Sequence, residues 1–253
     1  MYSKYLFLLM IIFSTILSGC HKDEPIATED LLSQHISGTH FEYYFSETDA
    51  DIIDTTWQEE YFLWFMEELD LDPNLKLEYR KYRDRAHLEK VTGKETNGFA
   101  EVGTNKFHTI WKIDSHESVH SIVTMLMGHP PPLFNEGIAV AYQADYFQPG
   151  FIPGWNGQDF HVLSKSFLDN GSIPSLDNLL SANTFFDISA DVTYPVAGSF
   201  VRYLIDTYGI YEMKDFINLS DFEDSKSQIR IDFQNAYGFS IDDAWNEWIL
   251  FIQ

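Results

Sequence analysis

The chain has 253 residues, of which 39 are acidic and 16 are basic, so its formal net charge is −23 with histidine neutral. Hydrophobic residues make up 45% and aromatic residues 16%, a composition that supports a large core and excludes disorder over most of the chain. A nucleic-acid partner needs a basic surface that displaces counterions from phosphates, so this chain is not expected to bind nucleic acid. The single cysteine excludes an internal disulfide.

The first 20 residues have the pattern of an export signal. Lys4 precedes an apolar or small stretch over residues 5–17, which is shorter than the roughly 20 apolar residues of a membrane span. The stretch leads into Leu-Ser-Gly and then Cys20, the only cysteine, and this ending resembles the lipobox of bacterial lipoproteins. The resemblance implies removal of residues 1–19 and attachment to a membrane through an acylated Cys20. The alternative is an ordinary secretory signal with an incidental cysteine.

Residues 21–30 are polar, contain Pro25 and show no periodicity, which is typical of a tether. The domain organisation expected from the sequence is therefore a lipoprotein signal peptide at 1–19, a tether at 20–34 and one folded domain at 35–253. The expected location is the bacterial cell envelope, with lipid anchoring to the outer membrane favoured and exposure at the cell surface left open.

The first half of the folded domain is expected to alternate between strands and helices. Trp57, Tyr61 and Phe65 recur at helical spacing, whereas Leu75, Leu77 and Tyr79 alternate with charged residues as in a half-buried strand. Residues 103–105, Gly-Thr-Asn, form a plausible hairpin turn. The strands predicted before residue 114 are 39–45, 75–82, 98–102 and 106–113, and the helices are 54–69 and 84–91.

The second half is expected to be nearly all helical. Asp114 can cap a helix over 115–127, with Glu117 in the capping-box position, and three consecutive prolines from Pro130 force a turn before a helix over 133–146. Further helices are predicted at 159–168, 194–208, 211–219, 225–237 and 241–252. Strands followed by helices predict an α+β fold of two lobes, without alternating βαβ units: residues 35–146 with the sheet, and a helical lobe at 147–253.

His116, Glu117 and His120 form an H-E-x-x-H motif within the helix predicted after Asp114. At 3.6 residues per turn the two histidines project from one helix face, where their imidazoles can bind one metal ion. Glu117 lies beside them and can accept a proton from a metal-activated water without binding the metal. The motif therefore predicts a hydrolytic metal site.

A catalytic zinc site needs a third protein ligand. The extended pattern H-E-x-x-H-x-x-G-x-x-H is excluded because Val123 and Leu126 occupy the later positions. His129 lies in a proline-bound loop, where a surface or structural role is favoured. Glu136 is the better candidate, because it lies near the start of the next helix beside Gly137, whose small size permits close approach of backbones.

The motif and the segment Asn135-Glu136-Gly137-Ile138-Ala139 together resemble the gluzincin metallopeptidases, specifically the membrane-alanyl-like group. The resemblance spans about residues 98–142 and continues more loosely through 194–204 and the last predicted helix. It implies a zincin-like fold, one zinc ion bound by His116, His120 and Glu136, and Glu117 as the general base. The interval of 16 positions between His120 and Glu136 is short for the family.

The resemblance implies hydrolysis of peptide bonds in peptide or protein substrates, with residues 98–102 pairing with an extended substrate. Tyr194 is the candidate donor to the tetrahedral oxyanion, with a half-buried core role as its alternative. Because the 98–102 segment shows no marked signature for capturing a substrate amine, an endopeptidase is preferred over an aminopeptidase. The alternative function is an inactive metal-binding or interaction lipoprotein that keeps the peptidase fold.

Overall fold

The computed structural model describes residues 31–49, 52–144 and 150–253. The predicted signal peptide, the acylation site at Cys20 and most of the predicted tether lie outside the described residues. Across the part of the chain that is described, no helix combines the length and apolar character needed to cross a bilayer.

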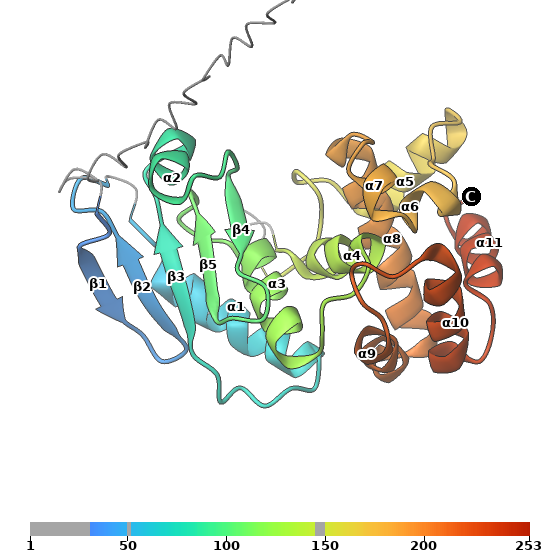
Figure 1. Ribbon diagram of the computed structural model, residues 1–253, viewed down its shortest axis with the longest axis horizontal. Helices are drawn as coiled ribbons and strands as arrows, with labels where there is room; N and C mark the ends of the chain where they lie inside the picture. The colour runs from blue at the N-terminus through green and yellow to red at the C-terminus, as the bar shows by residue number, and fades with distance from the viewer. Residues whose placement is uncertain (1–30, 50–51, 145–149) are drawn as a thin grey trace, which may run out of the picture.

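The N-terminal half is built on a five-stranded mixed sheet in the order β1-β2-β3-β5-β4, with β1 and β4 at its edges (Figure 1). The β2–β3 and β3–β5 pairs are parallel, whereas β1–β2 and the β4–β5 hairpin are antiparallel. The apolar side chains of one face, such as Phe41, Tyr79 and Phe107, are fully buried. The strands are β1 (Gln34–Ser37), β2 (Phe41–Phe45), β3 (Leu77–Lys81), β4 (Gly98–Ala100) and β5 (Lys106–Thr109), and the helices between them are α1 (Thr55–Glu68) and α2 (Arg85–Thr92).

Two features of the sheet differ from the sequence-based prediction. The strand predicted at 39–45 is β2 alone, and a separate edge strand, β1, precedes it. The sheet also contains a βαβ crossover that the prediction did not include, because α1 links the parallel pair β2 and β3. Parallel strands need a crossover connection, and the 14-residue α1 supplies it while burying its apolar face.

The C-terminal half is helical, which confirms the α+β class with a sheet lobe and a helical lobe (Figure 1). The short helices α6 and α7 were not predicted, and the helix expected from Tyr194 begins one turn earlier, so that Pro195 lies inside it. The helices are α3 (Ser115–Leu126), α4 (Pro132–Tyr142), α5 (Phe160–Asp169), α6 (Leu176–Leu179), α7 (Ala182–Phe185), α8 (Ala190–Tyr208), α9 (Ile210–Leu219), α10 (Lys226–Tyr237) and α11 (Ile241–Phe251).

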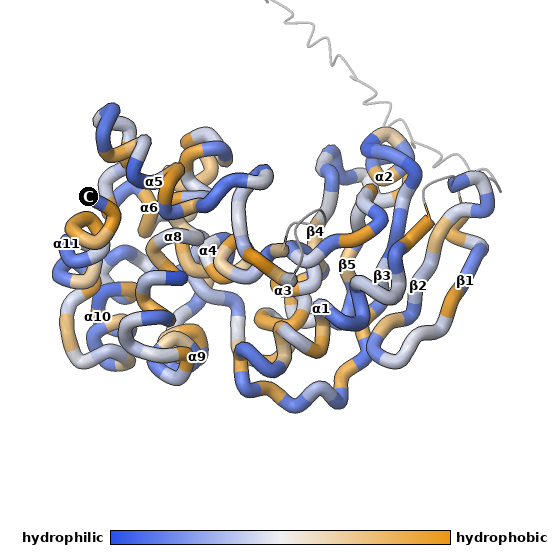
Figure 2. The backbone as a smooth tube through the Cα atoms, turned by 180° about the vertical axis from the view of Figure 1, so that it is seen from behind, coloured by the Kyte–Doolittle hydropathy of each residue, from blue (hydrophilic) through white to orange (hydrophobic). Residues whose placement is uncertain are grey.

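Helix α4 connects the two lobes at the centre of the molecule, where Figure 2 shows hydrophobic residues along α3 and α4. Every residue of α4 is buried, as expected for a helix without a polar face. Its packing against α8 depends on glycine: an added Cβ would lie 2.9 Å from Ala197 O at Gly137, and 2.4 Å from Val140 Cγ1 at Gly198. These two glycines let the helix backbones approach closely and fix the position of α4.

Candidate metal centre

Side chains of Asp114 and Gln58 hydrogen-bond to backbone N–H groups at the start of α3. Asp114 Oδ1 accepts a hydrogen bond from the backbone N–H of Glu117 at 2.9 Å, which confirms Asp114 as the N-cap. In a full capping box the N–H of Asp114 would donate to the Glu117 side chain. Here it donates instead to Gln58 Oε1 of α1, at 3.0 Å. Glu117 is therefore not used as a cap, and its side chain lies in a cavity.

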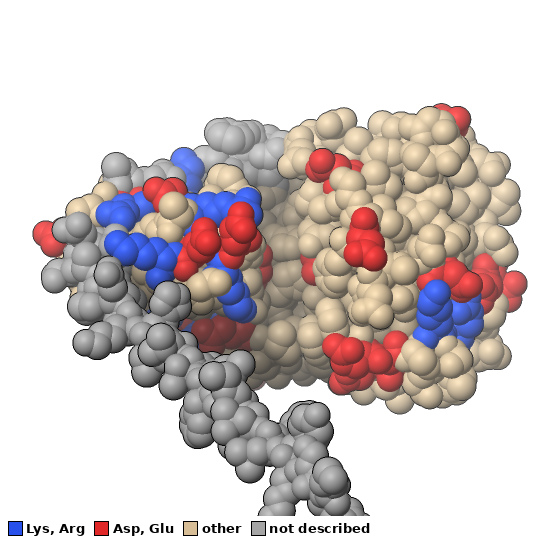
Figure 3. Space-filling view, turned by 45° about the horizontal axis from the view of Figure 1, so that its top comes forward, with Lys and Arg blue, Asp and Glu red and all other residues tan. Residues whose placement is uncertain are grey.

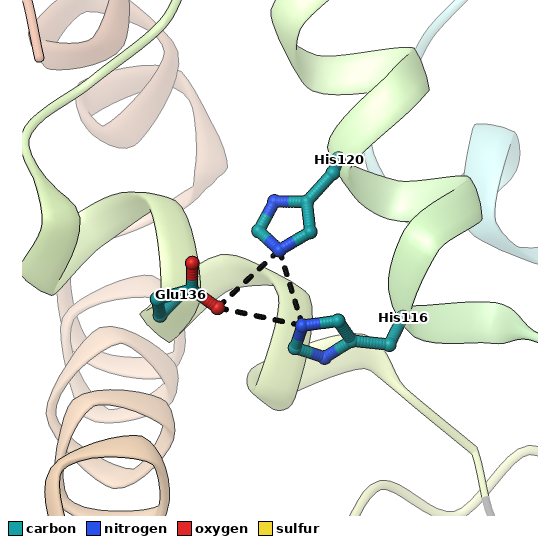
Figure 4. A group of neighbouring side chains, drawn as sticks. All are labelled: His116, His120 and Glu136. Carbon is teal, nitrogen blue, oxygen red and sulfur yellow. Dashed lines mark hydrogen bonds and ion pairs between the residues drawn. The ribbon is translucent and has the colours of Figure 1, made fainter. Parts of the chain in front are cut away.

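Three potential ligand atoms meet between α3 and α4. His116 Nε2 and His120 Nε2 lie 3.1 Å apart, and Glu136 Oε2 lies 3.4 Å and 3.3 Å from them. Figure 4 shows the two imidazoles projecting from α3 toward the carboxylate on α4. Glu136 is the fifth residue of α4, which begins at Pro132. Because proline suits the first position of a helix, the chain turns into α4 early enough for Glu136 to reach His120 over only 16 positions.

The three atoms have the spacing that a tetrahedral metal ion requires. Ligand atoms bound to tetrahedral zinc at about 2.0–2.1 Å lie about 3.3–3.4 Å from one another, which matches the separations of 3.1–3.4 Å observed here. Glu136 Oε2 is also buried without a hydrogen-bond partner among the described residues. A buried carboxylate oxygen needs a compensating partner, so the donor set fits a single cation held by two imidazoles and one carboxylate.

The electrostatics of the cluster also favour a cation. Burial opposes the charged form of His116, but the contact with Glu136 and the charges of Glu117 and Glu136 raise the pKa of His116 to about 9. The neighbouring imidazoles outweigh burial at Glu136 and hold its pKa well below the ordinary value. At Glu117 burial dominates, reinforced by the charge of Asp114, and raises the pKa to about 7. A raised pKa makes the Glu117 carboxylate a stronger proton acceptor.

The three atoms lie at a cavity of about 210 Å³ between the sheet lobe and the helical lobe. Edge strand β4 forms one wall, and Gly98 brings its backbone close: a Cβ there would lie 3.0 Å from Glu117 Oε1. A larger groove continues past His116 and Glu117, lined by residues that include Trp111, Trp155 and Asp191. Figure 3 shows the furrow between the lobes and a group of Lys and Arg side chains on the sheet lobe.

Tyr194 of α8 lines the same cavity as His116 and His120 of α3. Its ring is parallel to that of His116, with 6.0 Å between the ring centroids and 6° between their planes. Burial, followed by the negative charges of Glu136 and Glu117, holds the pKa of Tyr194 well above its ordinary value. The hydroxyl therefore stays protonated and can donate a hydrogen bond within the cavity.

His129 lines the same cavity, although it does not belong to the group of three potential ligands. Its ring stacks on Phe222 at a centroid distance of 4.4 Å, so it forms part of the wall contributed by the helical lobe. Sequence reasoning missed two residues that hold the site: Gln58, and Gln143, whose Oε1 lies 2.8 Å from His116 Nδ1. Neither belongs to a recognisable motif, because each reaches the site only through packing of distant segments.

Comparison with known proteins found a similar solved structure, but no family model and no curated protein sequence matches this chain. The structure is similar to the crystal structure of Legionella pneumophila aminopeptidase A in complex with aspartic acid, with a TM-score of 0.49 at 11% sequence identity. The similarity covers 83% of this chain but 26% of the Legionella chain, so this protein spans about a quarter of that enzyme. The function is therefore argued from the residues of the site.

Proposed function

We propose that this protein is a single-zinc metallopeptidase of the gluzincin type. The observation that carries the proposal is the triangle of His116 Nε2, His120 Nε2 and Glu136 Oε2, with sides of 3.1–3.4 Å, in a cavity that also contains Glu117. Two imidazoles and one carboxylate are a ligand set of catalytic zinc, which keeps a further position open. Zinc is preferred over other divalent ions because imidazole ligands suit it and its tetrahedral geometry fits the spacing.

The residues of the chain have distinct roles in the proposed reaction. When bound, zinc supplies Lewis acidity toward a water molecule and a substrate carbonyl. Glu117 accepts a proton from the attacking water and returns it to the leaving amine as the C–N bond breaks. Tyr194 donates a hydrogen bond to the oxyanion of the tetrahedral intermediate. One edge of β4 pairs with no other strand among the described residues, so an extended peptide can bind there as an additional strand.

The shape and charge of the site favour an endopeptidase. The groove past His116 and Glu117 and the cavity near His129 provide room on both sides of the three ligand atoms. Among the described residues, the carboxylates that line the 210 Å³ cavity are Glu117 and Glu136, both used in the proposed chemistry. Glu101, next to β4, instead pairs with His108 at 2.9 Å. The described lining of this cavity therefore offers no further carboxylate to a free substrate amine, whereas Glu95 and Asp191 line the adjoining groove.

Metal analysis and peptide cleavage with a Glu117→Gln variant test the proposal. The purified protein is expected to bind one zinc ion per chain and to cleave a mixed peptide library. Glu117→Gln should retain the zinc and lose about 10²–10⁴-fold in kcat. Glu89→Gln, an exposed residue on α2, is the matched control and should behave as the parent.

The outcomes separate the candidate functions. Cleavage at the parental rate by Glu117→Gln would remove Glu117 from the mechanism. Zinc binding without cleavage of any peptide would favour the alternative of an inactive metal-binding lipoprotein, and absence of bound zinc would refute both. Peptides with acetylated N-termini should be cleaved as well as free ones if the enzyme is an endopeptidase.

We also propose that the enzyme acts at the bacterial cell envelope, attached through an acylated Cys20. Support for this part comes only from the residue pattern at 5–20. Metabolic labelling with a radioactive fatty acid should mark the parent protein and not a Cys20→Ala variant. Equal labelling of the two would exclude Cys20 as the attachment site.

A further inference from the structure

The second ring nitrogen of His116 is engaged by the end of the neighbouring helix. Gln143, which follows α4 as its C-cap, places Oε1 2.8 Å from His116 Nδ1. Its amide nitrogen, Nε2, donates to the backbone carbonyl of Gly154 at 2.6 Å. A carbonyl oxygen can only accept, so this second bond fixes which end of the amide faces the imidazole. Nδ1 of His116 is therefore the donor, which leaves Nε2 as the ring nitrogen that can bind a metal once it has lost its proton.

Gln143 is itself held by contacts among three segments. Its N–H donates to Ala139 O at 2.7 Å, and the next residue, Ala144, donates to Ser115 Oγ at 3.0 Å. Ala144 also forms a β-bridge with Pro153. The end of α4 thus contacts both the start of α3 and the segment beginning at Pro153, so Gln143 has little freedom to move away from His116.

Gly154, which accepts the bond from Gln143, directly precedes a tight turn at the edge of the groove. Trp155 and Gln158 exchange two backbone hydrogen bonds of 2.8 Å and 3.0 Å. Asn156 and Gly157 between them have φ of 51° and 74°, the signature of a type I′ turn. The ring of Trp155 packs against Tyr194, with centroids 5.1 Å apart. The turn thereby carries an aromatic wall of the groove.

We propose that Gln143 is a positioning residue that orients His116 for metal binding and couples the metal site to the turn at 155–158. The inference rests on the proposed metal site. The side-chain amide of Gln143 bonds both to the His116 imidazole and to the carbonyl of Gly154. Metal binding that immobilises the imidazole therefore also immobilises Gln143 and, through it, the Gly154 carbonyl. Such partners of metal-bound histidines fix the ring orientation, and their loss typically weakens metal affinity about 10- to 100-fold.

Two substitutions of Gln143 test separately whether it orients His116 and whether it couples the metal site to the turn at 155–158. Gln143→Met keeps similar bulk but removes both hydrogen bonds, and zinc affinity measured by chelator competition should fall about 10- to 100-fold. Gln143→Glu keeps an acceptor for His116 but cannot donate to Gly154, so zinc affinity should be at least that of the parent. Gln234→Met, an exposed residue on α10, is the control for the substitution and should not change zinc affinity.

Hydrogen exchange reports the coupling. Adding zinc to the parent should slow exchange of the Trp155 and Gln158 amides, whereas in Gln143→Glu zinc should bind without this protection. Parental zinc affinity in Gln143→Met would overturn the positioning role, and equal protection in Gln143→Glu would overturn the coupling. If Gln143→Met does not fold, Gln143→Asn, which is one methylene shorter, applies the same test. A parent that binds no zinc would instead refute the proposed function itself.

Discussion

Replacing Gly137 with alanine is expected to destabilise the protein, although alanine is the better helix former. An alanine Cβ would lie 2.5 Å from Val201 Cγ2 and 2.9 Å from Ala197 O, and both separations are well below a van der Waals contact of about 3.5–4.0 Å. The first neighbour is a buried β-branched side chain and the second is backbone, so neither can move without a shift of α8. Helices α4 and α8 must therefore separate.

The expected magnitude combines two opposing terms. Replacing glycine with alanine in a helix interior stabilises by about 0.8–1.0 kcal/mol. Overpacking a core typically costs about 1–3 kcal/mol, and these two contacts indicate the upper half of that range. The net loss is then about 1–2 kcal/mol, which lowers the Tm by about 2–8 °C in a domain of this size. Because Glu136 precedes Gly137, zinc affinity should also fall.

Thermal unfolding of the zinc-free and zinc-loaded proteins measures both effects. In a double-mutant cycle, adding Val201→Ala to Gly137→Ala removes the closest clash, so the double variant should lose less stability than the sum of the two single variants. A Gly137→Ala protein as stable as the parent, with unchanged zinc affinity, would show that close approach of α4 and α8 does not set the position of Glu136.

Three further substitutions test other contacts of the site. Gln58→Met leaves the buried N–H of Asp114 without its acceptor, which should cost about 1–3 kcal/mol and appear as a lower Tm; an unchanged Tm would contradict this. Gly98→Ala places a Cβ 3.0 Å from Glu117 Oε1 and should lower kcat without loss of zinc, so parental kcat would count against the tight approach of β4. Tyr194→Phe should lower kcat by about 10²–10³-fold with zinc content and Tm unchanged, whereas a loss of Tm alone would indicate a core role.

The sequence was sufficient to predict the local elements of the site. The H-E-x-x-H spacing places both imidazoles on one face of α3, and Asp114 begins that helix as expected. The helix also ends close to the predicted residue 127, and Gly128 follows it with a φ of 139°, a backbone conformation that favours glycine. These features depend on hydrogen bonds between residues three or four positions apart, so the local order of amino acids encodes them.

What remained for the tertiary structure to decide involves segments far apart in the chain. The order of the sheet, with β5 between β3 and β4, follows from pairing and burial that no single strand specifies. Gln58 lies 56 residues before Asp114, and Gln143 lies 27 residues after His116, yet each makes a hydrogen bond that shapes the site. Neither glutamine belongs to a sequence motif, so each can be recognised as part of the site only after the fold has brought it to its hydrogen-bond partner. The sequence alone thus determined the composition of the α3 face and the candidate third ligand, whereas the triangle of ligand atoms and the side chains that orient it came from the packing of α1, α3, α4 and α8.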